Sequence, residues 1–283
     1  MGPGRIMPET VDDAINGILT TAKDGDYFGD DGLLYCGKCH TPKQVRLNFF
    51  GEERILPALC ECAESDLKRR KEEREKREFE RRVQRLRDAC FVSDKMHDYT
   101  FAGDDGLDIR ALTACKRYVA QWSDMKAENI GLLFYGNVGT GKTYYAACIA
   151  NALIDQGVRV LMTSFPRIVN TMQGMFEGRQ EYLDDIVNYP LLIIDDLGAE
   201  RDSSFMMEQV FNIIDARYQI GKPLIVTTNL SIEAIKKPSD PQYKRLYDRI
   251  LERCFPVKMS GVSRRRKQLH DDYARRARML GLE

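Results

Sequence analysis

Short apolar runs alternate with amphipathic stretches over the C-terminal two thirds of the chain. Five runs have the character of buried strands: "LLFY" (132–135), "VRVLMTS" (158–164), "PLLIIDD" (190–196), "PLIVTTN" (223–229) and "FPVKM" (255–259). The stretches between them, such as 142–157 and 203–220, carry apolar residues at helical spacing. Continuous apolar strands that alternate with helices are typical of a parallel sheet covered on both faces. We therefore predict an α/β domain over residues 96–283.

The segment before this domain has a different pattern. Of the 25 residues from 64 to 88, 19 are charged, and none is Gly or Pro. Opposite charges recur three and four positions apart, which supports a solvated helix. We predict a charged helical linker over 64–95, preceded by a small module at 33–63 and a weakly ordered segment at 1–32. A role for this helix in binding a partner or nucleic acid remains an alternative.

The small module contains four cysteines in two pairs. Cys36 and Cys39 form a C-x₂-C pair, and Cys60 and Cys62 form a C-x-C pair after twenty intervening residues. Four thiolates can surround Zn²⁺ tetrahedrally, and a module this small needs such a source of folding energy. His40 is an alternative ligand. A closed Cys₄ set leaves no open coordination position, so the predicted zinc is structural. The other four cysteines lack paired spacing and are expected to be buried thiols.

The composition of the chain indicates where the protein is located but does not identify its partners. Charged residues make up 30% of the chain and the formal net charge is +0, so overall charge does not indicate nucleic acid. No apolar run approaches the length of about 18 residues that a membrane span needs, and the N-terminus lacks a signal-peptide core. Cysteines without an export signal indicate a reducing compartment. We expect a cytoplasmic protein without a membrane partner or disulfides.

The clearest chemical signal is the loop "GNVGTGKT", which follows the first predicted strand and opens a predicted helix. Its glycines allow backbone N–H groups to surround phosphate oxygens, and the helix N-terminus favours the same anion. The lysine would reach the β- and γ-phosphates, and the final threonine would ligate Mg²⁺. The predicted ATP-binding residues are Gly136, Asn137, Val138, Gly139, Thr140, Gly141, Lys142 and Thr143.

Acidic and amide side chains end two later strands. Asp195 and Asp196 close "LLIIDD", where one carboxylate would hold Mg²⁺ and the other would polarise the attacking water. Asn229 closes "IVTTN" and would orient that water or touch the γ-phosphate. Together with the phosphate loop, these residues predict ATP hydrolysis.

Several segments resemble the AAA+ ATPases of the DnaC/DnaI/IstB family, which contains helicase loaders and transposase helpers. They are "GLLFYGNVGTGKTYYAACIANAL", "LLIIDDLGAE", "FNIIDARYQIGKPLIVTTNL" and "RLYDRILERC", and the resemblance covers about 95–270. It implies a P-loop NTPase with a five-stranded sheet of order 5-1-4-3-2, a spiral homo-oligomer, and a zinc module that binds the helicase. By position, Asn229 matches the sensor-1 residue, Arg249 the arginine finger and Arg265 the sensor-2 residue. Asp196 replaces the usual Glu, so slow hydrolysis is expected, and Glu200 is a candidate to share its role.

The resemblance leaves more than one function open. We favour an ATP-dependent loader that delivers a replicative ring helicase to single-stranded DNA. A transposase helper acting on duplex DNA, a nucleotide-gated adaptor with negligible hydrolysis and a small-molecule P-loop kinase are alternatives. In loaders, an insertion equivalent to 164–182 faces DNA, which makes four of its residues candidate DNA contacts: Phe165, Arg167, Phe176 and Arg179. Met172, Met175 and Phe176 also fit the core face of an amphipathic helix.

Overall fold

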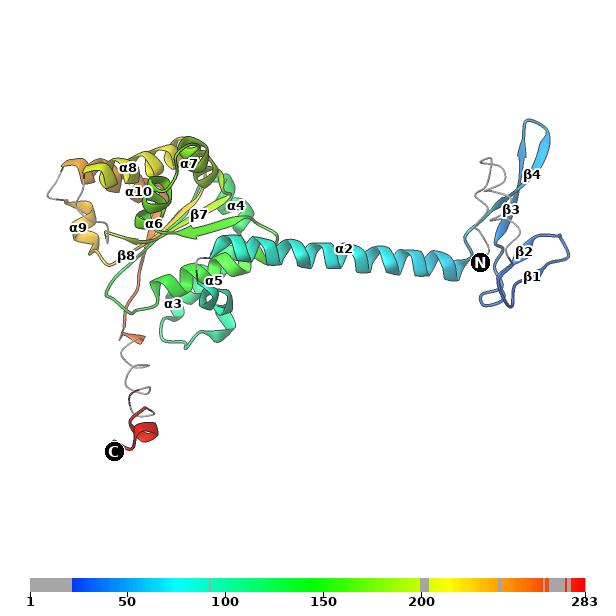
Figure 1. Cartoon of the computed structure of the whole chain (residues 1–283), viewed down its shortest axis with the longest axis horizontal. Coiled ribbons are helices and arrows are strands. Elements are labelled where there is room, and N and C mark those ends of the chain that lie inside the picture. The colour runs from blue at the N-terminus through cyan, green and yellow to red at the C-terminus, as the bar shows by residue number, and fades with distance from the viewer. Residues whose placement is uncertain are drawn as a thin grey trace. The chain divides into compact units, whose positions relative to one another are not determined.

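The computed structural model describes residues 22–91, 93–198, 204–238, 241–261, 263–264, 273 and 276–282. The chain forms two compact units, and the boundary between them falls after Phe79, within helix α2 (Glu61–Cys90) (Figure 1). Each unit has its own sheet structure and is described separately.

The N-terminal unit consists of two small antiparallel hairpins followed by the start of α2. Strand β1 (Tyr27–Phe28) pairs with β2 (Leu34–Tyr35), and β3 (Gln44–Phe49) pairs with β4 (Glu52–Pro57). The buried side chains of its described part are Leu34, Cys36, Gln44 and Cys60. So small an interior contributes little hydrophobic stabilisation, which explains why this unit needs a further source of stability.

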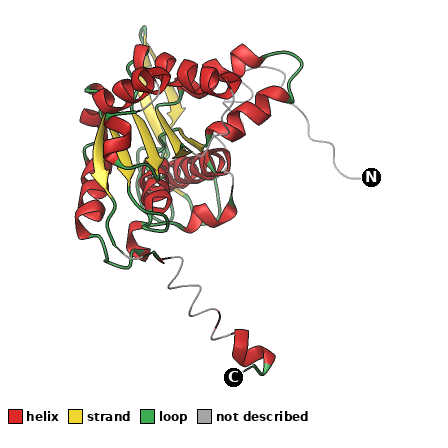
Figure 2. Ribbon diagram, turned by 90° about the vertical axis from the view of Figure 1, so that its left-hand side faces the viewer, coloured by secondary structure: helices red, strands yellow, loops and turns green. Residues whose placement is uncertain are grey.

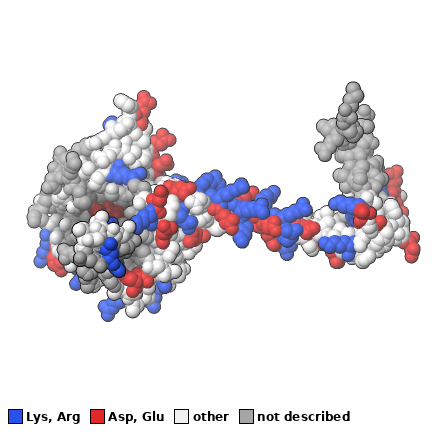
Figure 3. Space-filling view, turned by 60° about the horizontal axis from the view of Figure 1, so that its bottom comes forward, with Lys and Arg blue, Asp and Glu red and all other residues white. Residues whose placement is uncertain are grey.

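Helix α2 changes character along its length. Its first part is covered by exposed ion pairs between residues three and four apart, including Arg69 with Asp66 and Glu73. Figure 3 shows the resulting mixture of basic and acidic side chains along the helix. Water and salt screen exposed pairs of this kind, so they favour the helix without fixing a fold. In its last turns, Val83, Leu86 and Cys90 pack into the core of the C-terminal unit.

The C-terminal unit contains a five-stranded parallel sheet of order β6-β7-β8-β5-β9. All four neighbouring pairs are parallel. Numbered within this unit, the order reads 5-1-4-3-2 from the opposite edge, so the predicted fold class is confirmed. The strands are β5 (Gly131–Tyr135), β6 (Val160–Thr163), β7 (Leu191–Leu197), β8 (Leu224–Thr228) and β9 (Cys254–Lys258).

Helices cover both faces of this sheet because successive strand residues point to opposite sides (Figure 2). Leu132 and Phe134 of β5 pack with one group of helices, whereas Leu133 between them packs with the other group. The first group is α3 (Ile109–Ala120), α4 (Trp122–Ala127) and α5 (Lys142–Ile154). The second group is α6 (Phe165–Gln173), α7 (Arg179–Asn188), α8 (Ser204–Gln219), α9 (Ile232–Lys236) and α10 (Pro241–Arg253).

Two further predictions can be compared with the described residues. Cys90, Cys115, Cys148 and Cys254 are all buried free thiols, as expected from their unpaired spacing. Among the described residues, no helix is long and apolar enough to cross a membrane.

Candidate functional site

The phosphate loop lies between the C-terminal end of β5 and the start of α5, as the sequence pattern predicts. Gly136 and Gly141 have φ values of 136° and 100°, which side chains with a Cβ rarely adopt. At Gly136 a Cβ would also come within 2.4 Å of the carbonyl oxygen of Met259. No side chain caps the N-terminus of α5. The loop therefore presents backbone amides at a helix N-terminus, which fits a phosphate group.

Lys142 is buried at the centre of this loop, with 5% of its surface exposed. Its Nζ donates to the carbonyl oxygens of Gly136 at 2.9 Å and Asn137 at 2.8 Å, and to Oδ1 of Asn229 at 2.7 Å. Asn229 Nδ2 lies 3.3 Å from Oδ1 of Asp196. The structure thus brings together three residues that the sequence places on three separate segments.

Asp195 is the second centre of the site. Thr143 Oγ1 donates to its carboxylate, 2.9 Å from Oδ1 and 3.2 Å from Oδ2. Thr227 Oγ1 donates to the same Oδ1 at 2.5 Å. Burial raises the pKa of Asp195, although the hydrogen bonds from both threonines oppose that shift. A threonine hydroxyl and a buried carboxylate that meet beside a phosphate loop fit the oxygen ligands of Mg²⁺, which would offset the repulsion between Asp195 and Asp196.

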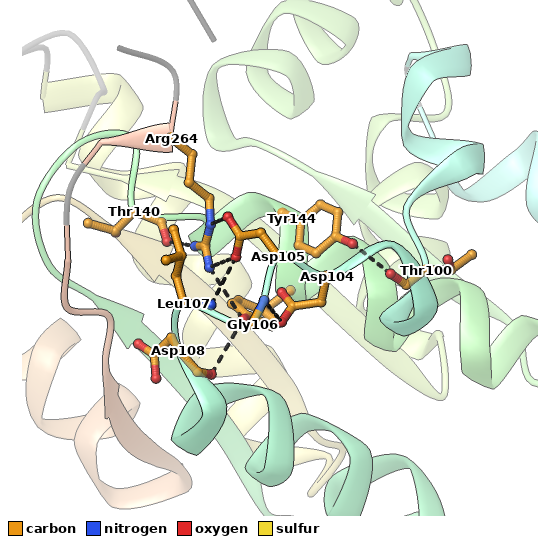
Figure 4. Close-up of polar contacts among 10 residues, drawn as sticks. Thr100, Asp104, Asp105, Gly106, Leu107, Asp108, Thr140, Tyr144 and Arg264 are labelled. Carbon is orange, nitrogen blue, oxygen red and sulfur yellow. Dashed lines mark hydrogen bonds and ion pairs between the residues drawn. The ribbon is translucent and has the colours of Figure 1, made fainter. Parts of the chain in front are cut away.

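A cavity of about 520 Å³ extends from the phosphate loop to a segment that precedes α3. This segment, called here the strap, comprises residues 94–108 and contains two short 3₁₀ helices, Asp94–Asp98 and Phe101–Gly103. Buried Asn151 of α5 holds it by donating to the carbonyl oxygens of Met96 at 2.8 Å and Tyr99 at 2.9 Å. Tyr144 donates to the carbonyl oxygen of Thr100 at 2.6 Å (Figure 4). The strap therefore forms the cavity wall beyond the phosphate loop.

Arg264 joins the strap to the phosphate loop, as Figure 4 shows. Its Nε and Nη2 lie 2.7 and 2.8 Å from the two carboxylate oxygens of Asp105, and Nη1 donates to the carbonyl oxygen of Thr140. The hydrogen bond from Arg264 lowers the pKa of Asp105. Arg265, predicted as the sensor-2 residue, lies outside the described residues. Its neighbour Arg264 is the arginine placed at the loop. Three arginines follow one another at 264–266, so sequence position alone does not show which of them reaches the loop.

Arg249 of helix α10 contacts residues of α8 in the same chain. Its Nη2 lies 2.7 Å from Oδ1 of Asp215 in α8, and its guanidinium lies 4.7 Å from the ring centre of Phe211. Its acidic partner therefore lies on another helix and not on α10 itself. About a quarter of the side chain, 26%, is exposed. Its role as an arginine finger stays a prediction. Glu200 lies outside the described residues.

The four predicted zinc ligands come together in the N-terminal unit. The Sγ atoms of Cys36, Cys39, Cys60 and Cys62 all lie within 4.8 Å of one another. A tetrahedral Zn²⁺ site with Zn–S bonds of about 2.3 Å places its sulfurs about 3.8 Å apart, so the set fits this ion. The hydrogen bond with Thr41 lowers the pKa of Cys39 to about 5, whereas hydrogen bonds with the thiols of Cys60 and Cys36 raise the pKa of Cys62 to about 12. The four thiols therefore need a cation to ionise together. His40 is outside this cluster; its Nδ1 lies 3.3 Å from the hydroxyl of Tyr27.

The candidate DNA contacts separate into two groups. Phe165 is fully buried, with 0% exposure, so its predicted stacking on bases is wrong; it begins α6 and packs into the core. Met172 is also buried, in agreement with the core alternative. Phe176 is fully exposed, which contradicts a core position and leaves its ring accessible. Arg167 and Arg179 are exposed as well.

Sequence reasoning missed three residues of the nucleotide site: Asp105, Tyr144 and Thr227. Tyr144 could have been predicted from the sequence, because it directly follows the phosphate loop. Thr227 lies within "IVTTN", but its position beside Asp195 depends on the register of β7 and β8, which the sequence does not specify. Asp105 had no sequence signal, since its partner lies 159 positions away.

Comparisons with known proteins agree with this geometry. The family model of IstB-like ATP binding proteins matches residues 59–271. The chain is 29% identical over 133 residues to the replicative helicase loader DnaC of Escherichia coli K12, a match that covers 46% of this chain and 53% of DnaC. It is 27% identical over 147 residues to the replicative helicase loader DnaI of Bacillus subtilis, covering 48% of this chain and 47% of DnaI. The chain thus spans about half the length of the curated relatives it matches.

A solved structure extends the agreement to the fold. The crystal structure of DnaI superposes with a TM-score of 0.54 at 26% identity, covering 64% of this chain and 99% of that one.

Proposed function

Because the chain belongs to the family of IstB-like ATP-binding proteins, we propose that it is an ATP-dependent loader for a replicative ring helicase. The proposed reaction is hydrolysis of Mg²⁺-bound ATP to ADP and phosphate, coupled to delivery of the helicase to single-stranded DNA. The names of the relatives DnaC and DnaI support the partner, since both are replicative helicase loaders.

The observation that carries the proposal is the convergence of Lys142, Asp195 and Asn229 at one edge of the sheet. Mg²⁺ bound there would supply charge neutralisation at the phosphates, with Thr143 and Asp195 as its protein ligands. Lys142 would hold the β- and γ-phosphates through its charge. Asp196 and Asn229 are placed together, where they would orient the attacking water. Asp196 has a shorter reach than the Glu of related enzymes, so we propose that hydrolysis is slow and increases with DNA or the helicase.

We further propose that the active form is a spiral homo-oligomer in which Arg249 reaches the ATP of a neighbouring subunit. The ion pair with Asp215 would have to open for this, and the partial exposure of Arg249 supports such a release. The zinc-binding module is proposed as the helicase-binding part. Exposed Arg167, Arg179 and Phe176 are proposed DNA contacts, because guanidinium groups bind phosphates and an exposed aromatic ring stacks on bases.

The loader hypothesis is tested by capture and hydrolysis measured on the same protein. Immobilised full-length chain is incubated with a hexameric replicative helicase, with ATP and without it, and hydrolysis is measured with and without single-stranded DNA. We expect the wild type to retain the helicase and to hydrolyse ATP, and Lys142→Ala to lose nucleotide binding and hydrolysis. Absence of helicase capture, with hydrolysis stimulated by duplex DNA instead, would favour the transposase-helper alternative. Helicase capture gated by ATP without measurable hydrolysis would favour the adaptor.

A further inference from the structure

Two adjacent residues of β7, Asp195 and Asp196, both place their carboxylates at the nucleotide site. Asp195 contacts Thr143, and Asp196 contacts Asn229 and lines the same cavity as Thr143. Successive side chains of a regular strand point to opposite faces of the sheet. A regular β7 would therefore direct one of the two carboxylates away from the site.

An irregularity in the pairing of β7 with β8 removes this restriction. Ile194 is opposite Val226, but the next paired residue of β7, Leu197, is opposite Thr228. Three steps along β7 thus match two along β8, which leaves one extra residue in β7. Asp196 has a φ of 58°, in the left-handed region that non-glycine residues rarely occupy. Such bulges re-aim side chains, and here the bulge brings both acids to one edge.

Thr227 lies opposite this bulge and satisfies both acids at once. Its hydroxyl donates to Oδ1 of Asp195 at 2.5 Å and accepts the backbone N–H of Asp196 at 2.9 Å. The residue is completely buried, at 0% exposure, so no water replaces these contacts. One hydroxyl therefore fixes the carboxylate orientation of Asp195 and the left-handed backbone of Asp196.

The next residue provides an internal comparison. Thr228 is equally buried, and its hydroxyl donates to the carbonyl oxygen of Leu197 at 2.7 Å and accepts the N–H of Leu230 at 3.1 Å. It therefore supports the same bulge without touching either carboxylate. Replacing each threonine in turn therefore distinguishes the stability that the bulge contributes to the fold from the positioning of the two carboxylates.

We propose that Thr227 is the positioning residue that sets Asp195 for Mg²⁺ and Asp196 for the attacking water. This rests on the proposed ATPase function, because it concerns the same site. Thr143 and Asp195 would hold Mg²⁺, and Thr227 is the hydroxyl that would remain available to hold Asp195.

The test compares Thr227→Val, which keeps the shape and loses the hydroxyl, with Thr227→Ser, which keeps the hydroxyl. Thr228→Val is the matched control. For each full-length variant, the affinity for a fluorescent ATP analogue is titrated with Mg²⁺, and hydrolysis and thermal unfolding are measured in parallel. Thr227→Ala replaces Thr227→Val if the valine variant does not fold.

We expect Thr227→Val to raise the Mg²⁺ concentration for half-maximal effect by about 10–100-fold and to lower kcat similarly, with Mg²⁺-free affinity within about twofold of wild type. Thr227→Ser should stay within about threefold of wild type, and Thr228→Val should lower thermal stability without moving the Mg²⁺ midpoint. A wild-type midpoint in Thr227→Val, equal midpoint shifts in both valine variants, or no rescue by serine would overturn the proposal. A wild type that binds Mg²⁺ and nucleotide but does not hydrolyse ATP would contradict the ATPase function instead, and the Mg²⁺ midpoint would still decide the role of Thr227.

Discussion

Arg217 of α8 is a fully buried cation whose removal should destabilise the ATPase unit strongly. It is 1% exposed and donates to four backbone carbonyl oxygens. One belongs to the last turn of α7, at Val187 (2.6 Å), and two to the connection between α7 and β7, at Tyr189 (2.5 Å) and Pro190 (3.1 Å). The fourth is Pro223, directly before β8 (2.5 Å). The side chain therefore fixes the start of β7, which carries Asp195 and Asp196, and the start of β8, which Asn229 follows.

The magnitude follows from what Arg217→Met leaves behind. Hydrogen bonds to a charged group contribute about 1.5–3 kcal/mol each, and a buried acceptor without a partner costs about 1–3 kcal/mol. Burial also lowers the pKa of Arg217 to about 9, so the guanidinium itself carries a desolvation cost that methionine removes. These contributions are not additive for one side chain, and we expect Arg217→Met to lower the free energy of unfolding by about 3–5 kcal/mol. For a unit of this size, that lowers Tm by about 10 °C.

Thermal and urea unfolding of the full-length chain, followed by circular dichroism, measures this loss. Lys222→Met is the matched control, because Lys222 also donates to a carbonyl at the end of α7, that of Asn188 at 2.8 Å, but is only partly buried. We expect the control to cost less than about 1 kcal/mol. If Arg217→Met unfolds within about 2 °C of wild type, or no earlier than Lys222→Met, water reaches the four carbonyls and the reasoning fails.

Three further predictions address the sites. Burial raises the pKa of Asp195 above its ordinary value of 3.8, so the stability of the folded state falls as pH rises through that raised pKa. Asp195→Asn should therefore raise the apo Tm at neutral pH and abolish the extra Tm gain from adding Mg²⁺ to ATP. A lower apo Tm would show that the carboxylate stabilises the fold. Cys36→Ser should reduce zinc from one ion per chain to near none by elemental analysis and unfold the N-terminal unit while ATP binding persists, whereas wild type purified without chelator and free of zinc would contradict the site. Arg249→Ala should bind ATP but hydrolyse it about 10³-fold more slowly, and mixing it with Asp195→Asn should restore part of the rate; normal hydrolysis by Arg249→Ala alone would exclude the shared site.

The sequence predicts the sheet well because each strand is a continuous apolar run bounded by polar residues. All five predicted strands are present with boundary shifts of one or two residues, and the order from the family resemblance is confirmed. The cysteine cluster can be predicted from the sequence equally well, because paired cysteines in a module too small for a hydrophobic core point to a shared metal ion. The family resemblance itself is confirmed by the match over residues 59–271.

Side-chain pairings across the fold were not predictable in the same way. Phe165 occupies a position that sequence alone cannot assign, because an aromatic residue at a helix start fits the core and a DNA surface equally. Arg249 pairs with Asp215 on another helix, 34 positions away, and not with acids of its own helix. Such choices depend on how α8 and α10 pack, which periodicity does not specify.

The site also depends on a departure from the periodicity that predicts it. The run "LLIIDD" indicates a buried strand because its apolar residues are continuous, and a regular strand would send Asp195 and Asp196 to opposite faces. In the structure, a one-residue register shift and a left-handed backbone conformation at Asp196 bring both acids to one edge. This backbone conformation needs compensating contacts to persist. Those contacts come from hydroxyl groups of β8, which substitute for the ladder hydrogen bonds that the shift removes. A threonine pair opposite two adjacent acids is therefore the sequence feature to look for wherever a strand must present both acids at one edge.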